Sequence, residues 1–272
     1  MTLVTKMFEL PEFNVTGNNI HMKKVSYQRF PAGVASDASI YEVGENASGT
    51  PKVSCLMVTR GNFDLAKTAY YSFKLQTWSN KELIIVCDAG ADELKGLVAS
   101  DQQVKFIEAP SGLTLGELRN ISIAHASGDF VCQWDDDDLY APERISVCVG
   151  ILISASVDAV FLNSWIVWWM QRQSMCISPS RIWEGSLLAR RSVMPIYPAL
   201  KKGEDTTVSK WITEYFPVAL IDCPQLYCYR ITGENTWNEA HFEGLFSAAV
   251  KHFKPEEFDG VFSLPCFASL KC

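Results

Sequence analysis

The chain has 272 residues, 48% of them hydrophobic and 20% charged, which is typical of a folded globular protein and excludes an intrinsically disordered one. Its formal net charge of −7, with no cluster of Lys and Arg, argues against nucleic-acid binding and against general adhesion to an anionic membrane surface. The nine cysteines form no CxxC pair and no Cys/His metal spacing, so we expect reduced, buried thiols in a cytoplasmic protein.

The first 50 residues show no sustained hydrophobic period, and we expect 1–50 to be an N-terminal extension that packs on or trails from the main domain. No signal peptide is expected, because Met1–Val15 lacks a long apolar core. The apolar stretch 145–170 has about the length of a membrane span, but its polar residues favour a core helix followed by a buried strand over 159–169. No transmembrane segment is therefore predicted.

From residue 51 onward, apolar strands alternate with helices. Helices are predicted at 65–76 and 115–126, with Gly128 as the stop signal of the second, and strands are predicted at 53–58, 83–87, 104–107 and 130–134. This alternation predicts an α/β fold with a doubly wound, mostly parallel sheet. Ligands of such sheets bind at the carboxyl ends of the strands, where Thr59, Asp88 and the run Asp135–Asp138 fall.

The second half of the chain is less regular and predicts a smaller mixed region. A helix begins near Pro142, a short helix follows Asp205, and a closing helix is expected near 238–252. Strand-like segments are found at 160–169, 175–178, 185–191, 218–221 and 226–231.

Four consecutive aspartates, Asp135–Asp138, are the strongest single feature of the sequence. One interpretation is a solvated acidic turn. However, the run follows an apolar strand and precedes a helix, and carboxylates this close repel one another unless a cation neutralises them. Hard oxygen ligands at a strand end suit Mg²⁺ or Mn²⁺ bridging to a phosphate group. A phosphatase that forms an aspartyl phosphate is disfavoured. Its nucleophilic Asp would follow an early strand, whereas the aspartates here follow the fourth predicted strand.

Five segments in order resemble glycosyltransferase family 2, whose fold is the GT-A nucleotide-sugar-binding domain: VSCLMVTRGN (53–62), LQTWSNKELIIVCDAG (75–90), LGELRNISIAHASGDFVCQWDDDDLYAPERI (115–145), GEDTTV (203–208) and YRITGENTW (229–237). The resemblance covers roughly 51–242. It implies a nucleotide-binding half at 51–145 and an acceptor-binding, catalytic half at 146–242, followed by a C-terminal segment at 243–272.

The resemblance also implies an activity. It implies inverting transfer of a sugar from a nucleoside-diphosphate sugar, in the first place a UDP-sugar, with Mn²⁺ or Mg²⁺ as cofactor. The implied acceptor is a glycan or a lipid-linked glycan, in the synthesis of surface polysaccharide or glycoconjugate. The implied location is the cytoplasm, either free or peripheral at the inner face of the membrane.

Site residues carry over where the motifs match. Thr59 and Arg60 match the residues that bind the nucleoside, and Asp88 matches the acid that reads the base. Arg119 and Asn120 match an Arg-Asn pair near the nucleotide.

The aspartate run contains the DxD element of the family. Asp137 matches the direct metal ligand, and Asp135 or Asp136 lies toward ribose and metal, with the register open by one residue. The family often has His where this chain has Thr232, so His241 is a candidate to complete the metal shell.

Asp205 matches the general base, a positioned carboxylate that takes the proton of the attacking hydroxyl, and Glu204 is the next candidate. A helix cap is the alternative role for this pair. Two rival functions remain open. One is a nucleotidyltransferase, although Thr59–Asn62 supplies no basic Gly-rich loop. The other is a catalytically inactive protein that binds nucleotide sugars or glycans, which is favoured by the presence of Thr232 where the family often has His.

Overall fold

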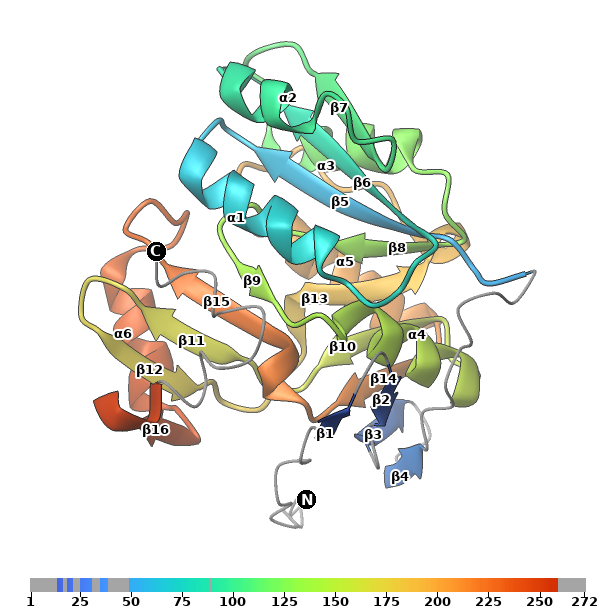
Figure 1. Cartoon of the computed structure of the whole chain (residues 1–272). Coiled ribbons are helices and arrows are strands. Elements are labelled where there is room, and N and C mark those ends of the chain that lie inside the picture. Colours follow the sequence, from blue (N-terminus) through green and yellow to red (C-terminus); the bar gives the residue numbers. More distant parts are fainter. Residues whose placement is uncertain are drawn as a thin grey trace.

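The computed structural model describes residues 49–258 except residue 89, and the backbone of four short strands within 14–38. A nine-stranded sheet forms the centre of this part of the chain, and a five-stranded sheet lies beside it (Figure 1). The strands β1 (Asn14–Thr16) and β2 (Asn19–His21) pair only with each other among the described elements.

The nine-stranded sheet is mixed. The pairings among β8, β5, β6 and β7 are parallel, which confirms the sheet predicted for the first half, whereas β13 pairs antiparallel with both β8 and β10. Two strands of the N-terminal extension, β3 and β4, join the far edge of the sheet next to β14. In spatial order the strands are β4 (Ala35–Ala38), β3 (Val25–Phe30), β14 (Val218–Ile221), β10 (Ala159–Leu162), β13 (Trp183–Arg190), β8 (Phe130–Gln133), β5 (Val53–Thr59), β6 (Lys81–Cys87) and β7 (Val104–Glu108).

The five-stranded sheet is built mostly from the second half of the chain. Its order is β16 (Lys251–Phe253), β12 (Ser174–Ile177), β11 (Ile166–Trp169), β15 (Tyr227–Ile231) and β9 (Leu139–Tyr140). The single strand expected over 159–169 was wrong, because β10 belongs to the large sheet and β11 to the small one. The polar backbone between them is paired elsewhere: Asn163 N–H donates to the Ile221 carbonyl and Trp165 N–H to Ser178 Oγ.

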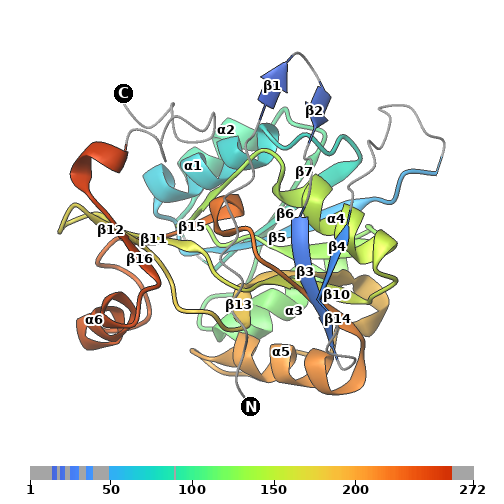
Figure 2. The same ribbon diagram turned by 90° about the horizontal axis from the view of Figure 1, so that it is seen from below.

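Helices cover both faces of the large sheet (Figure 2). Alternate side chains of β5 point to opposite faces: Cys55 and Met57 pack with α1 (Phe63–Lys74), α2 (Asp92–Val98) and α4 (Arg144–Ser154), whereas Leu56 and Val58 pack with α3 (Leu115–His125). The helix α5 (Glu204–Tyr215) covers β13 on the α3 side. The strands are therefore buried on both faces, as parallel strands of α/β proteins are.

The closing helix is shorter than expected. The helix α6 (Glu239–Ser247) packs on the small sheet through Phe242 and Phe246, which contact Trp169, and the expected range to residue 252 was too long because His252 lies in β16. Single 3₁₀ turns are formed at Arg191–Val193, Pro224–Leu226 and Pro255–Glu257.

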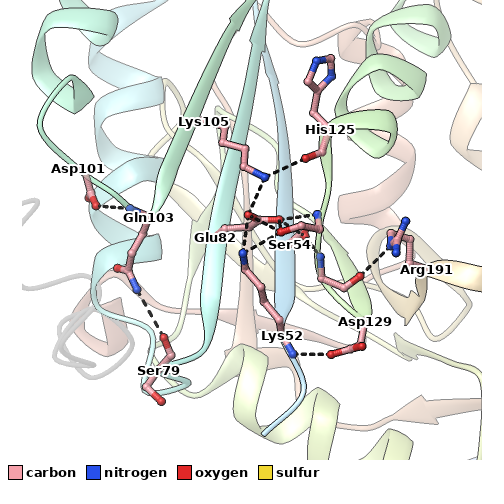
Figure 3. Close-up of polar contacts among 12 residues, drawn as sticks. Lys52, Ser54, Ser79, Glu82, Asp101, Gln103, Lys105, His125, Asp129 and Arg191 are labelled. Carbon is pink, nitrogen blue, oxygen red and sulfur yellow. Dashed lines mark hydrogen bonds and ion pairs between the residues drawn. The ribbon is translucent and has the colours of Figure 1, made fainter. Parts of the chain in front are cut away.

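A polar cluster lies at the amino ends of the parallel strands, opposite the ends where ligands are expected (Figure 3). Its centre is Glu82 on β6, which is 3% exposed. The carboxylate accepts hydrogen bonds from Ser54 Oγ at 2.7 Å and Lys52 Nζ at 2.8 Å, and forms an ion pair with Lys105 at 3.1 Å. This cluster ties β5, β6 and β7 together.

Seven cysteines of the described residues are buried and lie in no disulfide bond, as expected for buried thiols. Cys266 and Cys272 lie outside the described residues, as does most of the segment considered for a signal peptide. Among the described residues, no helix has the length and apolar character needed to cross a membrane.

Candidate active site

The aspartate run forms the loop between β8 and β9. Asp135, Asp136 and Asp137 line a large cleft at the carboxyl ends of the strands. Asp138 is fully buried and is used structurally, since its carboxylate accepts hydrogen bonds from Tyr227 Oη at 2.6 Å and from the backbone N–H of Arg230 at 2.8 Å. Asp138 therefore fixes the loop against β15 and leaves three carboxylates for the cleft.

An Arg at the centre of the site joins three elements. Arg119 on α3, 7% exposed, donates from NH2 to Asp135 at 3.0 Å and from Nε to Glu204 at 2.8 Å. This places the first turn of α5 beside the aspartate loop. Arg119 lines the cleft, as expected of a residue near the nucleotide, but its two ion pairs make it a positioning group as well.

The two carboxyl groups at the start of α5 differ in their surroundings. Glu204 is 1% exposed and bonded to Arg119. Asp205 lines the cleft, accepts a hydrogen bond from the Thr206 N–H at 2.7 Å, and forms no ion pair within the described part of the chain. Burial raises the pKa of Asp205, and the nearby charge of Arg119 opposes this rise. A partly buried carboxylate free of a bonded cation has the properties of a proton acceptor.

The residues expected to bind the nucleoside lie at neighbouring strand ends. Arg60, just after β5, lines the cleft, while Thr59 is buried and accepts a hydrogen bond from the Gly61 N–H at 3.2 Å. Asp88 follows β6, whose Cys87 is paired with Thr59, so Asp88 lies at the same edge of the sheet although it is not one of the cleft-lining residues.

Asn120 has a local role. Its side-chain amide donates to the Tyr197 carbonyl and accepts from the Tyr197 N–H, both at 2.8 Å. These bonds hold the segment ahead of α5 against α3. Both polar atoms of the Asn120 amide are therefore bonded to the backbone of Tyr197, and Asn120 does not line the cleft.

A segment after β15, residues 232–237, contributes lining residues to the cleft. Asn235 Nδ2 donates to Asp137 at 3.0 Å, and Glu234 accepts from the Asn62 side chain at 2.8 Å. Sequence reasoning included this segment in the family resemblance but assigned no role in the cleft to Asn62, Glu234 or Asn235. Asn62 also caps α1, since its side-chain oxygen accepts a hydrogen bond from the Leu65 N–H at 3.3 Å.

The aspartates of the loop favour a bound cation. Burial raises the pKa of Asp136 to about 6, a hydrogen bond with Thr59 opposes this, and the charge of Asp135 adds to it. Burial, followed by the charges of Asp138 and Asp136, raises the pKa of Asp137 well above its usual value. Carboxylate oxygens gathered in this way are the donors that Mg²⁺ and Mn²⁺ prefer.

The described residues contain no group of three His, Cys, Asp or Glu side chains already arranged to hold a metal ion. The arrangement is still compatible with Mg²⁺, which is commonly held by one or two carboxylates together with substrate phosphates and water. His241 lies on α6 and lines the same cleft, with its ring stacked on Trp237 at 4.6 Å. Thr232 is bonded to Asn235, its N–H donating at 2.7 Å.

The cleft has a volume of about 800 Å³, enough for more than one small ligand. Trp165, Trp183 and Tyr229 line one wall, with Trp165 4.3 Å from Trp183 and stacked on Tyr229 at 5.3 Å between ring centroids. This aromatic wall lies on the side of β13 and the small sheet, away from the strand ends that carry Arg60 and Asp88.

The fold of the chain is similar to that of solved structures. The fold resembles that of TarS from S. aureus, with a TM-score of 0.55 over 72% of this chain and 70% of the TarS 1–349 chain, at 15% identity. TarS 1–349 in complex with UDP-GlcNAc gives a TM-score of 0.52 over 78% of this chain and 65% of that one. The fold is thus the α/β GT-A fold of glycosyltransferases.

The sequence comparison gives a family match for part of the chain. Residues 54–175 match the family model "Glycosyl transferase family 2", which supports the resemblance to this family over that segment of the chain. "Putative colanic acid biosynthesis glycosyl transferase WcaA" of Escherichia coli K12 is 33% identical over 101 residues, 36% of each chain. The Escherichia coli protein "UDP-Glc:alpha-D-GlcNAc-diphosphoundecaprenol beta-1,3-glucosyltransferase WfgD" is 24% identical over 94 residues, 34% of this chain. The matches span 36% and 37% of these two relatives' own lengths.

Proposed function

We propose that the protein is an inverting glycosyltransferase that moves a sugar from a nucleoside-diphosphate sugar to an acceptor hydroxyl. The observation that carries the proposal is the position of Asp205, whose carboxylate shares one cleft with Asp135–Asp137 and has no bonded cation among the described residues. The match of residues 54–175 to the family model supports the reaction class. In this proposal, 51–145 bind the donor and 146–242 supply the acceptor side.

The chemistry assigned to Asp205 is proton acceptance. As the acceptor oxygen attacks the anomeric carbon, its O–H bond breaks, the proton passes to the Asp205 carboxylate, and the bond from sugar to diphosphate breaks on the opposite face. The raised pKa of Asp205 makes the carboxylate a better base. Glu204 does not compete for this role, because its carboxylate is held by Arg119.

Asp137, with Asp135 or Asp136, would hold a divalent cation. When bound, Mg²⁺ or Mn²⁺ would offset the negative charge that develops on the departing diphosphate. Asn235 now donates to Asp137, so it would have to share or release that oxygen when a cation binds. Arg119 keeps Asp135 in place throughout.

A UDP-sugar is the proposed donor, and a glycan or lipid-linked glycan the proposed acceptor. TarS has been crystallised with UDP and with UDP-GlcNAc, and WfgD is named for a UDP-Glc donor and a diphosphoundecaprenol acceptor. The proposed setting is surface polysaccharide synthesis in the cytoplasm, at the inner face of the membrane where a lipid-linked acceptor is used.

A second candidate is a catalytically inactive nucleotide-sugar-binding protein. It is favoured by the bonding of Thr232 to Asn235, which puts a structural residue where the family often has His. An assay for Mn²⁺-dependent hydrolysis of UDP-sugars in the absence of acceptor distinguishes the two candidates. The inactive protein would bind the donor without cleaving it.

The test of the donor site is Asp137→Ala. We expect the wild type to bind UDP only in the presence of Mg²⁺ or Mn²⁺, and the variant to lose this metal-dependent binding while keeping its circular dichroism spectrum. The measurement is calorimetric titration with UDP and each cation. Asp92→Ala, which removes an exposed carboxylate on α2, is the matched control and should bind UDP normally. Unchanged, metal-dependent binding by Asp137→Ala would contradict the assignment.

A further inference from the structure

Cationic side chains gather on the acceptor side of the cleft. Arg181, Lys201 and Lys202 all line the cleft, and none belongs to the strand ends or the aspartate loop assigned to the donor. The two lysines are exposed, and within the described part of the chain neither forms an ion pair. A protein whose net charge is −7 thus places two unpaired lysines, together with Arg181, at one wall of its active site.

Two of these cations, Arg181 and Lys202, contact aromatic rings. The Lys202 ammonium lies 3.7 Å from the centroid of the Trp237 ring, and the Arg181 guanidinium lies 3.9 Å from that of Trp183. Such contacts orient the side chains without neutralising them. The charge of Lys202 therefore remains available to a ligand, whereas Arg181 also pairs with Glu184 and can offer a ligand only its remaining N–H groups.

The cluster lies beside the proposed base. Arg181 forms an ion pair with Glu184 at 3.3 Å, and Glu184 accepts a hydrogen bond from Thr206 Oγ1 at 3.5 Å in the first turn of α5. Lys201 and Lys202 precede Asp205 by only a few residues in the chain. His241 lies among the same cations, since burial, followed by the charges of Arg181 and Lys202, lowers its pKa.

We propose that Arg181, Lys201 and Lys202 form an anion-binding subsite for a negatively charged group of the acceptor, next to the hydroxyl that Asp205 deprotonates. The inference rests on the proposed function, because it identifies this wall as the acceptor side. The anion is a phosphate attached to the accepting sugar or a carboxylate of a uronic acid, since both present oxygens to ammonium and guanidinium groups. The donor diphosphate has its own place at the aspartate loop.

The test compares three small probes on protein saturated with UDP and Mg²⁺: n-butyl phosphate, n-butyl β-glucuronide and n-butyl β-glucoside. Dissociation constants come from ligand-observed ¹H NMR titrations. We expect at least one anionic probe to bind roughly 10- to 100-fold more tightly than the neutral glucoside, the scale of hydrogen bonds to charged groups. Tighter binding of the phosphate identifies a phosphate-bearing acceptor, and tighter binding of the glucuronide a uronic acid.

Variants assign the effect to the cluster. Arg181→Ala and Lys202→Gln should each remove most of the preference for the anion, and Lys202→Arg should keep it. Lys210→Ala, an exposed lysine of α5 that does not line the cleft, is the control and should change nothing. The affinity for UDP with Mg²⁺ should stay the same in all four variants.

Two outcomes would overturn the subsite. One is that the anionic probes bind no better than butyl glucoside. The other is that Lys202→Gln and Arg181→Ala weaken UDP binding as much as probe binding, which would give these cations to the donor diphosphate. If the proposed function is wrong, the wild type will not bind UDP, which is a separate result. In that case the probe titrations are repeated without UDP, and they still show whether the cluster binds an anion.

Discussion

Asp205 and Glu204 are adjacent in the chain, yet their carboxyl groups have different partners. Glu204 is bonded to Arg119 at 2.8 Å and is almost fully buried, whereas Asp205 faces the cleft. The helix makes this separation, because successive residues at its start point in different directions. One carboxylate therefore positions α5 and the other is free for chemistry.

The substitution Asp205→Asn keeps size and polarity but removes the proton acceptor. General-base catalysis typically contributes ~10²–10⁴-fold, so turnover should fall by that order while affinity for the donor is unchanged. Transfer assays and donor titrations on one protein preparation measure both quantities. Loss of donor binding would instead place Asp205 in the metal shell.

The control is Glu204→Gln, which leaves the buried Arg119 with a weaker partner. Breaking a buried ion pair costs about 3–5 kcal/mol, and a neutral hydrogen-bonding replacement should cost at most that much of the free energy of unfolding. Urea denaturation measures it. If Glu204→Gln abolished turnover at normal stability and Asp205→Asn did not, the two roles would be exchanged.

At the level of elements, the approach of α3 to the segment before α5 sets the geometry of the site. Gly116, in the first turn of α3, lies against the backbone of Pro198, and a Cβ added there would lie 1.8 Å from the Pro198 carbonyl oxygen. The Asn120 clamp on Tyr197 holds the same segment one turn further along α3. Both contacts place Glu204 within reach of Arg119.

Gly116→Ala should therefore displace the segment before α5. Overpacking of this kind costs about 1–3 kcal/mol, and we expect a loss of stability in that range together with reduced turnover, since Asp205 moves with α5. Thermal unfolding and transfer assays are the measurements. Gly96→Ala is the matched control: it lies in α2 with no atom within 4 Å of an added Cβ, so it should be neutral or stabilising. Equal effects of the two substitutions would contradict the steric argument.

For the molecule as a whole, the two ends of the parallel strands have different roles. Carboxylates at the carboxyl ends line the cleft, whereas at the amino ends Glu82 is enclosed by cations and hydroxyl groups (Figure 3). Burial alone would raise the pKa of Glu82, but hydrogen bonds from Lys52, Ser54 and Ser127 outweigh it and lower the pKa to about 2. The buried charge of Glu82, at the amino ends of the parallel strands, thus stabilises the fold.

Stability should depend on pH through this cluster. Because the pKa of Glu82 is lowered in the folded state, its contribution is fully present above about pH 4.5 and is lost as the pH falls toward 2. The contribution is about 3 kcal/mol at neutral pH. Urea denaturation of the wild type and of Glu82→Gln should show a difference in unfolding free energy that shrinks between pH 4.5 and 2.5. A difference for Glu82→Gln that stays constant over this pH range would refute the prediction.

Local patterns were sufficient for the class of fold and the place of the site. The alternation of apolar strands with helices from residue 51 predicted the parallel part of the sheet, because burial on both faces requires continuous apolar strands such as β5 and β6. The position of Asp135–Asp138 after a strand predicted that carboxylates would meet other strand ends there. The spacing of apolar residues and the position of polar residues just after a strand are both features of short segments. Both can therefore be read from the sequence without knowing the tertiary structure.

Contacts between distant segments decided the rest. Which aspartate is structural depends on Tyr227, 89 residues away from Asp138 in the chain. The position of Asn235 depends on its hydrogen bond to Asp137, 98 residues before it. The division of 159–169 between two sheets depends in the same way on pairing with β14 and β15. No local pattern encodes such partners, because each is chosen by the packing of whole elements. The family motif ranked Asp205 ahead of Glu204 and selected Asp137, but only the tertiary structure shows that Glu204 is bonded to Arg119 and Asp138 to Tyr227.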